Sequence, residues 1–300
     1  MLRYPHLLGW TPIAFHAEPE GAVEWADLRG HAFDKPFFNR TLAAWRAGAN
    51  PPTIRTDLNA FEELDAQPSL EPDLIIAHAS RCGSTLLARL AALEEGTLLV
   101  SEPPVVPQLL AGNLAHGLGR PVEQVLREAV RSLGRVRFGT ERRYVLKLNS
   151  QMSRFLPELR RAFPNAPIVW LQRQPSEIIE SNLKDPADPH RVIPLDEATR
   201  RTVRRVMLAF MGATAFVDDR IQVLDYRELP DAAWTRVADL MGIDPAADRI
   251  ARARDLAKIH AHSDKPFAPR SRRPLCEAMQ AVIRQTLDPM YDTLAHRWSN

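Results

Sequence analysis

The stretch DLIIAHASRCGSTLLARL, residues 73–90, decides the fold of this chain. It opens with a short apolar run, 73–79, which predicts a buried strand. It continues with leucines at helical spacing, which predict a helix that begins at about Gly83. The loop between the two, residues 80–85, therefore joins the end of a strand to the start of a helix. Such a helix start binds oxyanions, because its backbone N–H groups and the positive end of its dipole face the ligand.

The side chains of this loop suit an anion such as phosphate. Gly83 lets the backbone approach the ligand, and Arg81 supplies a fixed positive charge. Hydroxyl donors come from Ser80, Ser84 and Thr85. The Walker pattern has a lysine where this chain has Ser84, so the loop does not favour a standard ATP hydrolase. On its own, the turn is equally consistent with an ordinary strand-to-helix connection that a serine caps.

The alternation of short apolar strands and helices continues to the C-terminus and predicts an α/β fold. Further strands are expected at 97–100, 143–148, 167–172 and 221–226. Helices are expected at 122–133, 175–184, 196–217, 231–242 and 274–297, with a helical segment that ends near Phe163. Residues 71–300 are thus predicted to form a parallel β-sheet of the P-loop type with helices on both faces. Residues 1–70 contain the helix candidates NRTLAAWRAG and TDLNAFEEL, which predict a mainly helical N-terminal extension.

The composition limits the function class and the compartment. The chain has 300 residues, 45% of them hydrophobic, and a net charge of +2, so it lacks the basic excess of a general nucleic-acid or membrane-surface binder. Its two cysteines are far apart and form neither a disulfide framework nor a multi-cysteine metal site. No apolar run approaches the roughly 18–20 residues of a membrane span, and the first residues do not read as a secretory signal. We therefore expect a soluble, cytoplasmic protein with no nucleic-acid or membrane partner.

A second turn that suits an oxyanion follows the predicted strand 167–172. It carries Arg173, and Ser181 follows near the end of the next helical segment. A guanidinium and a hydroxyl group can together hold a phosphate. Ligands of parallel sheets bind at the carboxyl ends of the strands, where both turns are expected. Two such turns on one sheet indicate a ligand with phosphate-like groups at both ends.

Two further charged residues follow or end predicted strands. Glu102 comes just after the strand 97–100, where a carboxylate is unfavourable for binding an anion. We therefore expect it to act as a general base, with a helix-capping glutamate as the structural alternative. Lys147 lies inside the apolar strand YVLKLN, and buried lysines are rare unless they are paired. We expect it to face an anionic group, the alternative being a solvent-facing residue on an edge strand.

Five segments, taken in order, resemble the sulfotransferase superfamily, whose members use 3′-phosphoadenosine 5′-phosphosulfate (PAPS). They run from about Asp73 to the C-terminus and are HASRCGSTLLARL, LLVSEP, YVLKLNS, FPNAPIVWLQRQPSEIIESNL and VLDYREL. The resemblance implies that the loop 80–85 binds the 5′-phosphosulfate and that Arg173 and Ser181 bind the 3′-phosphate. It also implies that Glu102 is the base, as in the bacterial and Golgi-type branches. Arg81 and Lys147 would then stabilise the transferred group.

The chain departs from the family pattern at three places. Cys82 stands where serine is usual, and its backbone N–H can still bind phosphate. The glycine-rich C-terminal loop that covers the 3′-phosphate in the cytosolic members is not evident, and Ser263 and Lys265 are the candidates to replace it. The histidine base of the cytosolic members has no clear counterpart, which favours Glu102 as the base.

The resemblance implies an enzyme that transfers a sulfuryl group from PAPS to a hydroxyl, or with less support an amine. The product would be 3′,5′-adenosine bisphosphate (PAP), no metal would be required, and the acceptor would be a small molecule, carbohydrate or peptide. Residues 1–70 would form part of the acceptor pocket or a homodimer contact. Two alternatives stay open. One is a P-loop kinase or ATPase, and the other is a non-catalytic nucleotide-binding protein of the same fold.

Overall fold

The computed structural model describes residues 3–18, 21–49, 51–183, 192–216, 220–244, 246–259, 266 and 273–296. Two of the predicted site residues, Ser263 and Lys265, lie outside these described residues.

Five parallel strands form the central sheet, in the order β5-β6-β4-β7-β8. Their bounds are Leu74–His78 (β4), Thr97–Ser101 (β5), Arg143–Lys147 (β6), Ile168–Gln172 (β7) and Ile221–Asp225 (β8). β5 pairs in parallel with β6, and β7 pairs in parallel with β8. Every residue of β4 and β7 is buried, as expected for strands covered on both faces. The predicted α/β fold with a parallel sheet is confirmed.

Helices and single turns connect these strands. The longer helices are α3 (Ser84–Ala91), α4 (Val105–His116), α5 (Val122–Leu133), α6 (Leu156–Ala162), α7 (Pro175–Asn182), α8 (Glu197–Ala215), α10 (Ala247–Ala257), α11 (Glu277–Thr286) and α12 (Asp288–His296). The short elements are α9 (Ala238–Leu240), η1 (Pro5–Leu7), η2 (Ser150–Phe155), η3 (Tyr226–Glu228) and the π-turn η4 (Ala233–Val237). Within the described residues, no helix combines the length and the apolar character that a bilayer crossing needs.

The N-terminal segment contains a sheet that the sequence reading missed. The expected helices are present as α1 (Phe38–Ala49) and α2 (Asn59–Leu64), but three antiparallel strands accompany them. These strands are β1 (Thr11–His16), β2 (Ala22–Ala26) and β3 (Thr53–Thr56). The expectation of a mainly helical extension overlooked these strands because none of them is an uninterrupted apolar run: Pro12 interrupts β1, Glu24 interrupts β2 and Arg55 interrupts β3. In β1 the pairing register also shifts between Pro12 and Ala14.

The chain folds into two compact units. Unit 1 comprises Met1–Ile75, Glu94–Lys147 and Pro157–Ala166. Unit 2 comprises Ile76–Leu93, Leu148–Leu156 and Pro167–Asn300. The N-terminal segment thus packs in the same unit as β5, β6, α4 and α5. The domain division at residue 70 stays a prediction.

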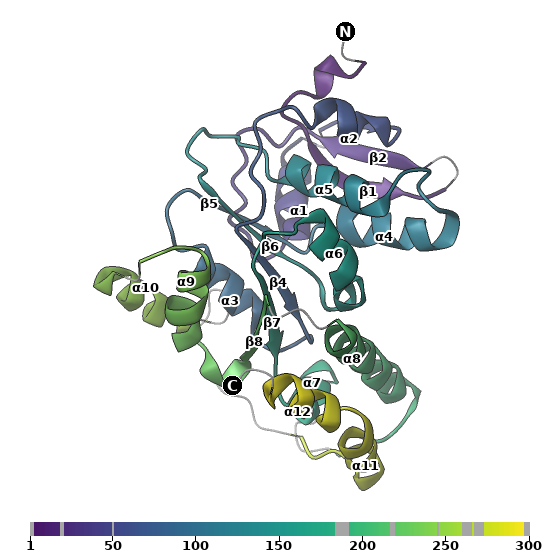
Figure 1. The fold of residues 1–300 in the computed structure, drawn as a ribbon, viewed down its shortest axis with the longest axis vertical. Helices are drawn as coiled ribbons and strands as arrows, with labels where there is room; N and C mark the ends of the chain where they lie inside the picture. The colour runs from purple at the N-terminus through teal and green to yellow at the C-terminus, as the bar shows by residue number, and fades with distance from the viewer. Residues whose placement is uncertain are drawn as a thin grey trace. The chain divides into compact units, whose positions relative to one another are not determined.

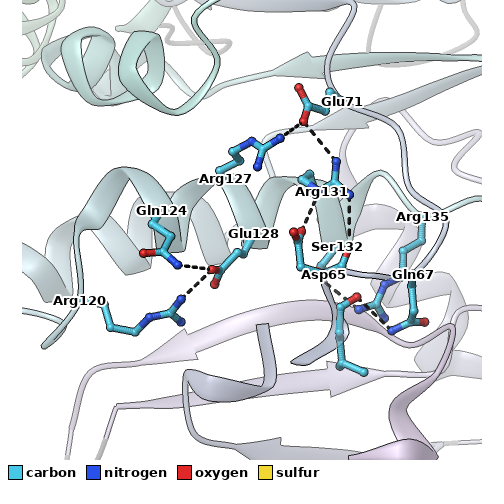
Figure 2. A network of polar contacts seen from close by, with 11 residues as sticks. Asp65, Gln67, Glu71, Arg120, Gln124, Arg127, Glu128, Arg131, Ser132 and Arg135 are labelled. Atoms are coloured by element: carbon cyan, nitrogen blue, oxygen red, sulfur yellow. Dashed lines mark hydrogen bonds and ion pairs between the residues drawn. The ribbon is translucent and has the colours of Figure 1, made fainter. Parts of the chain in front are cut away.

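In unit 1 a network of charged side chains fastens α5 to the connector that follows α2. Arg131 donates from Nε to Asp65 at 2.7 Å and from Nη1 to Glu71 at 3.2 Å (Figure 2). Arg127 pairs with the same Glu71, and Arg120 donates to Glu128 at 2.6 Å. Arg127 and Arg131 of α5 thereby hold the connector between α2 and β4 at Asp65 and Glu71.

A buried guanidinium links α5 to the first residues of the chain. Arg135 is fully buried and donates from Nη1 to the carbonyl groups of Leu7 and Trp10. Its guanidinium also lies over the ring of Trp25, 5.5 Å from the centroid. Burial lowers the pKa of Arg135 to about 10, so the group remains charged at neutral pH. The carbonyl groups and the ring compensate part of the cost of removing this charge from water.

In unit 2, helices lie on both sides of β7 and β8. Figure 1 shows α3, α9 and α10 on one side of these strands and α7, α8 and α12 on the other. Trp170 of β7 packs edge-on against Phe210 of α8, with ring centroids 5.9 Å apart. Both rings are buried, so they anchor the longest helix to the sheet.

The core of the N-terminal segment gives a stability prediction. Trp25 is buried and donates its indole N–H to Thr56 Oγ1 at 2.9 Å. Replacement Thr56→Val keeps the shape but leaves the indole N–H without its acceptor. The free energy of unfolding, measured by urea denaturation, should fall by about 1–3 kcal/mol. The same exchange at the exposed Thr140 is the control and should change stability by less than about 0.5 kcal/mol. Equal effects at both positions would contradict the role given to this hydrogen bond.

Candidate functional site

The backbone of the turns after β4 and β5 is strained at predicted site residues. Among the described residues, only three that are not glycine have a positive φ: Ser80 (72°), Arg81 (46°) and Glu102 (56°). Each such residue costs about 1–3 kcal/mol and persists only where the surrounding structure enforces it, most often at functional sites. The strain therefore supports a function for both turns, on grounds independent of the motifs.

His78 and Cys82 fix the path of the loop after β4. His78 is buried, and its Nδ1 accepts the N–H of Ser80 at 3.1 Å. Its Nε2 lies 2.9 Å from the carbonyl of Leu148, so the proton of the neutral ring is on Nε2. Cys82 is fully buried and its thiol donates to the carbonyl of Leu171 at 3.2 Å. Both side chains are turned into the protein interior, and the loop presents its backbone instead.

The loop leads directly into α3. Gly83 has a φ of 87° and precedes the helix, whose first residues, Ser84 and Thr85, are buried. A Cβ added to Gly83 would lie 2.7 Å from Cδ2 of Tyr226 and 3.1 Å from Cδ1 of Leu229. Glycine is therefore required here both for its backbone conformation and for the close approach of Tyr226.

Three predicted phosphate-binding residues come together in unit 2. Arg81 donates from Nε to Ser181 Oγ at 3.2 Å. Arg173 donates from Nη1 to the backbone carbonyl of Arg81 at 3.3 Å. The loop after β4, the turn after β7 and the end of α7 are thus joined by hydrogen bonds, and they gather two guanidinium groups and a hydroxyl. This arrangement is suited to a ligand with more than one oxyanion group.

Two contacts of Arg173 were not predicted from the sequence. Its Nε donates to Glu177 Oε2 at 2.6 Å, and its guanidinium lies over the ring of Tyr226, 4.4 Å from the centroid. The spacing of Arg173 and Glu177, four positions apart across a helix start, was the available signal for the first contact. The motif VLDYREL contains Tyr226, but nothing in the sequence indicated which side chain it would meet.

The end of β8, next to Tyr226, is held by a hydrogen-bonded group. Asp225 accepts from the Tyr291 hydroxyl at 2.5 Å and from Arg227 Nε at 2.8 Å. Burial favours the protonated form of Asp225, but the hydrogen bonds from Arg227 and Tyr291 outweigh it and hold the pKa of this carboxyl below its usual value. These contacts join α12 to β8 and fix the strand end from which Tyr226 projects.

Glu102 and Lys147 form an ion pair in unit 1. Lys147 is fully buried and donates from Nζ to Glu102 Oε1. The N–H of Glu102 also donates to the carbonyl of Lys147 at 2.7 Å. The Glu102 side chain remains 28% exposed. Lys147 is thus buried against a carboxylate, and the catalytic roles of Lys147 and Glu102 stay predictions.

An aromatic residue of the N-terminal segment borders this pair. The ring centroid of Phe37, which directly precedes α1, lies 5.4 Å from Lys147 Nζ. Phe37 is half-buried, while the adjacent Phe38 is buried.

A cavity of about 510 Å³ lies in unit 2, but none of the predicted site residues lines it. Its lining residues are Ser176, Glu180, Arg273, Pro274, Leu275, Gln280, Ile283, Arg284 and Asp288. Within the described part of the chain, no group of three or more His, Cys, Asp or Glu residues is arranged to hold a metal ion.

Solved structures resemble this chain, whereas no protein-family model and no curated protein matches it. A sulfotransferase from Mycobacterium avium is 17% identical, covers 78% of this chain and 81% of its own, and gives a TM-score of 0.46. A mouse sulfotransferase in complex with PAP is 12% identical, with coverages of 80% and 93% and a TM-score of 0.46. A sulfotransferase from Alicyclobacillus acidocaldarius is 13% identical, with coverages of 75% and 94% and a TM-score of 0.45.

These three structural neighbours are all sulfotransferases. This is the superfamily that the five sequence segments resemble. Likeness at these identities and TM-scores assigns no activity by itself. The function proposed below therefore depends on this chain's own residues: Arg81, Arg173 and Ser181 in unit 2, and Glu102 and Lys147 in unit 1.

The close approach of Tyr226 gives a prediction for Gly83. Replacement Gly83→Ala imposes a positive φ on alanine and displaces Tyr226, so the free energy of unfolding should fall by about 2–4 kcal/mol. Gly242, also at positive φ, has no atom within 4 Å of an added Cβ, so Gly242→Ala is the matched control. The control should lose only about 1–2 kcal/mol of unfolding free energy, the cost of a positive φ on alanine. Equal losses in chemical denaturation would show that the Tyr226 contact has no cost.

Proposed function

We propose that this chain is a PAPS-dependent sulfotransferase that transfers a sulfuryl group to a hydroxyl, or an amine, of an acceptor. The observation that carries the proposal is the joining of Arg81, Arg173 and Ser181 by hydrogen bonds at the ends of β4 and β7. Two guanidinium groups and a helix start suit a ligand that bears several oxyanion groups, as PAPS does.

Different residues would bind the two phosphate-bearing ends of PAPS. The backbone of the loop 80–85, with the hydroxyls of Ser80, Ser84 and Thr85, would hold the 5′-phosphosulfate. Arg173 and Ser181 would hold the 3′-phosphate, with Ser263 and Lys265 as further candidates. When bound, PAPS supplies the sulfuryl group and leaves as PAP.

Glu102 and Lys147 have the chemistry for the transfer step. The Glu102 carboxylate takes the proton of the acceptor hydroxyl, whose oxygen forms the new bond to sulfur. The bond between sulfur and the bridging oxygen breaks, and the electron pair stays on the departing phosphate. The ammonium of Lys147 and the guanidinium of Arg81 stabilise the negative charge that develops there. A sulfuryl group carries less negative charge than a phosphoryl group, so we propose that these side-chain cations stabilise the transition state without a metal.

The N-terminal segment would contribute to the acceptor side of this site. Phe37 lies against the ammonium of Lys147, whose partner is the proposed base. An aromatic face beside the base is suited to hold the body of an acceptor molecule. This contact favours the acceptor pocket over a homodimer contact as the role of residues 1–70.

Nucleotide binding is the first test of the proposal. PAP at saturating concentration should raise the melting temperature by several degrees, because a ligand at about 100 times its Kd adds about 2.7 kcal/mol. The measurement is a thermal shift assay with PAP, with 5′-AMP as the control that lacks the 3′-phosphate, and with Mg-ATP. Stabilisation by Mg-ATP alone would reject the proposal and favour the kinase or ATPase alternative.

The base is tested by Glu102→Gln. The glutamine amide keeps an oxygen that accepts a hydrogen bond from Lys147, but it cannot take up a proton from the hydroxyl of the acceptor molecule. We expect turnover with PAPS to fall by a factor of about 10²–10⁴. PAP affinity, measured by calorimetry, should stay within about twofold, since Gln changes none of the proposed nucleotide contacts. Nearly full activity of the variant would exclude Glu102 as the base.

A further inference from the structure

We propose that Glu177 is a positioning residue that holds Arg173 for the 3′-phosphate and thereby sets the selectivity for a 3′-phosphorylated nucleotide. The inference rests on the proposed function. Glu177 lies in the fourth of the five segments, but the sequence analysis assigned it no role.

The ion pair of Arg173 and Glu177 is short and partly desolvated. Arg173 Nε lies 2.6 Å from Glu177 Oε2, and the two side chains are 23% and 18% exposed. An ion pair at this exposure is screened less by water than one on the open surface, so it restrains the arginine more strongly. It joins the residue that directly follows β7 to the first turn of α7.

Glu177 occupies a favourable position in α7. The helix begins at Pro175, whose ring fixes the backbone of the first turn. A carboxylate in that turn also interacts favourably with the positive end of the helix dipole. The helix start therefore holds Glu177 in place before any ligand binds.

The other contacts of Arg173 leave one edge of the guanidinium for a ligand. Nη1 donates to the carbonyl of Arg81, and the face of the group lies on the Tyr226 ring. Within the described residues, no hydrogen bond or ion pair uses Nη2. Since Glu177 takes Nε, the edge formed by Nη1 and Nη2 retains the donors for a bidentate contact with phosphate.

Fixing the arginine in advance lowers the cost of binding. An arginine side chain carries about 2 kcal/mol of rotamer entropy, which a mobile residue would lose when it binds phosphate. Contacts to Nε, to Nη1 and to the ring face restrict that freedom in the free protein. The opposite role is also conceivable: a carboxylate that competed with the phosphate for Arg173 would weaken PAP binding. Removal of Glu177 distinguishes the two roles, because it weakens PAP binding if Glu177 positions Arg173 and strengthens it if Glu177 competes with the phosphate.

The test is calorimetric titration with PAP and with 5′-AMP, which differ in the 3′-phosphate. The variants are Glu177→Ala, Glu177→Gln and the control Glu180→Ala. Glu180 is on the same helix, and its carboxylate accepts the N–H of Arg273 rather than bonding Arg173. We expect Glu177→Ala to weaken PAP binding by about tenfold, which corresponds to the loss of one charge-assisted hydrogen bond. The binding of 5′-AMP, which has no 3′-phosphate, should weaken by less than about twofold. Glu177→Gln should retain most of the affinity, and Glu180→Ala should leave the ratio of the two affinities unchanged.

Three outcomes would overturn the inference. Unchanged or tighter PAP binding by Glu177→Ala would show that Glu177 does not position Arg173. Equal losses for PAP and 5′-AMP would show a general effect on the fold of α7. A wild-type protein that does not distinguish PAP from 5′-AMP would reject the proposed function and this inference with it.

Discussion

The strained loop after β4 is the constraint on which the candidate nucleotide site depends. Two successive residues of this loop, Ser80 and Arg81, have a backbone conformation that side chains disfavour. The buried imidazole of His78 compensates by holding the Ser80 N–H on one side and the Leu148 carbonyl on the other. A neutral histidine with a fixed tautomer can accept and donate at once, which a phenyl or alkyl side chain of similar size cannot.

Each predicted cation of the site that the structure describes has a partner within the protein. Lys147 has Glu102, Arg173 has Glu177, and Arg81 has the hydroxyl of Ser181. A buried or half-buried cation without a partner is costly, so the free protein stabilises these groups with its own acceptors. A ligand must then either use the donors that these partners leave over, as proposed for Arg173, or replace a partner with an acceptor at least as good.

The sequence predicted secondary structure and burial correctly where a pattern within a few residues determines them. The strand, loop and helix at 73–90 form as predicted, because apolar runs and glycine positions act within a few residues. The burial of Lys147 was also predictable, since a charged residue inside an apolar strand must be paired. By contrast, the contacts of Tyr226 with Gly83 and Arg173 join β8 to two other strand ends. Such contacts depend on the order of strands in the sheet, and no local pattern encodes that order.

The three-stranded sheet near the N-terminus was missed because its strands lack uninterrupted apolar runs, and because β3 pairs with β2 across a long connection that contains α1. The same segment is bound to the rest of unit 1 through Arg135, which lies among the carbonyl groups of Leu7 and Trp10. A chain that began after Trp10 would leave this guanidinium buried and without those acceptors. The backbone at Leu7 and Trp10 therefore supplies acceptors to a buried charge. A deletion of this backbone would require a change at position 135 as well, whereas a side-chain exchange at Trp10 leaves both carbonyl acceptors in place.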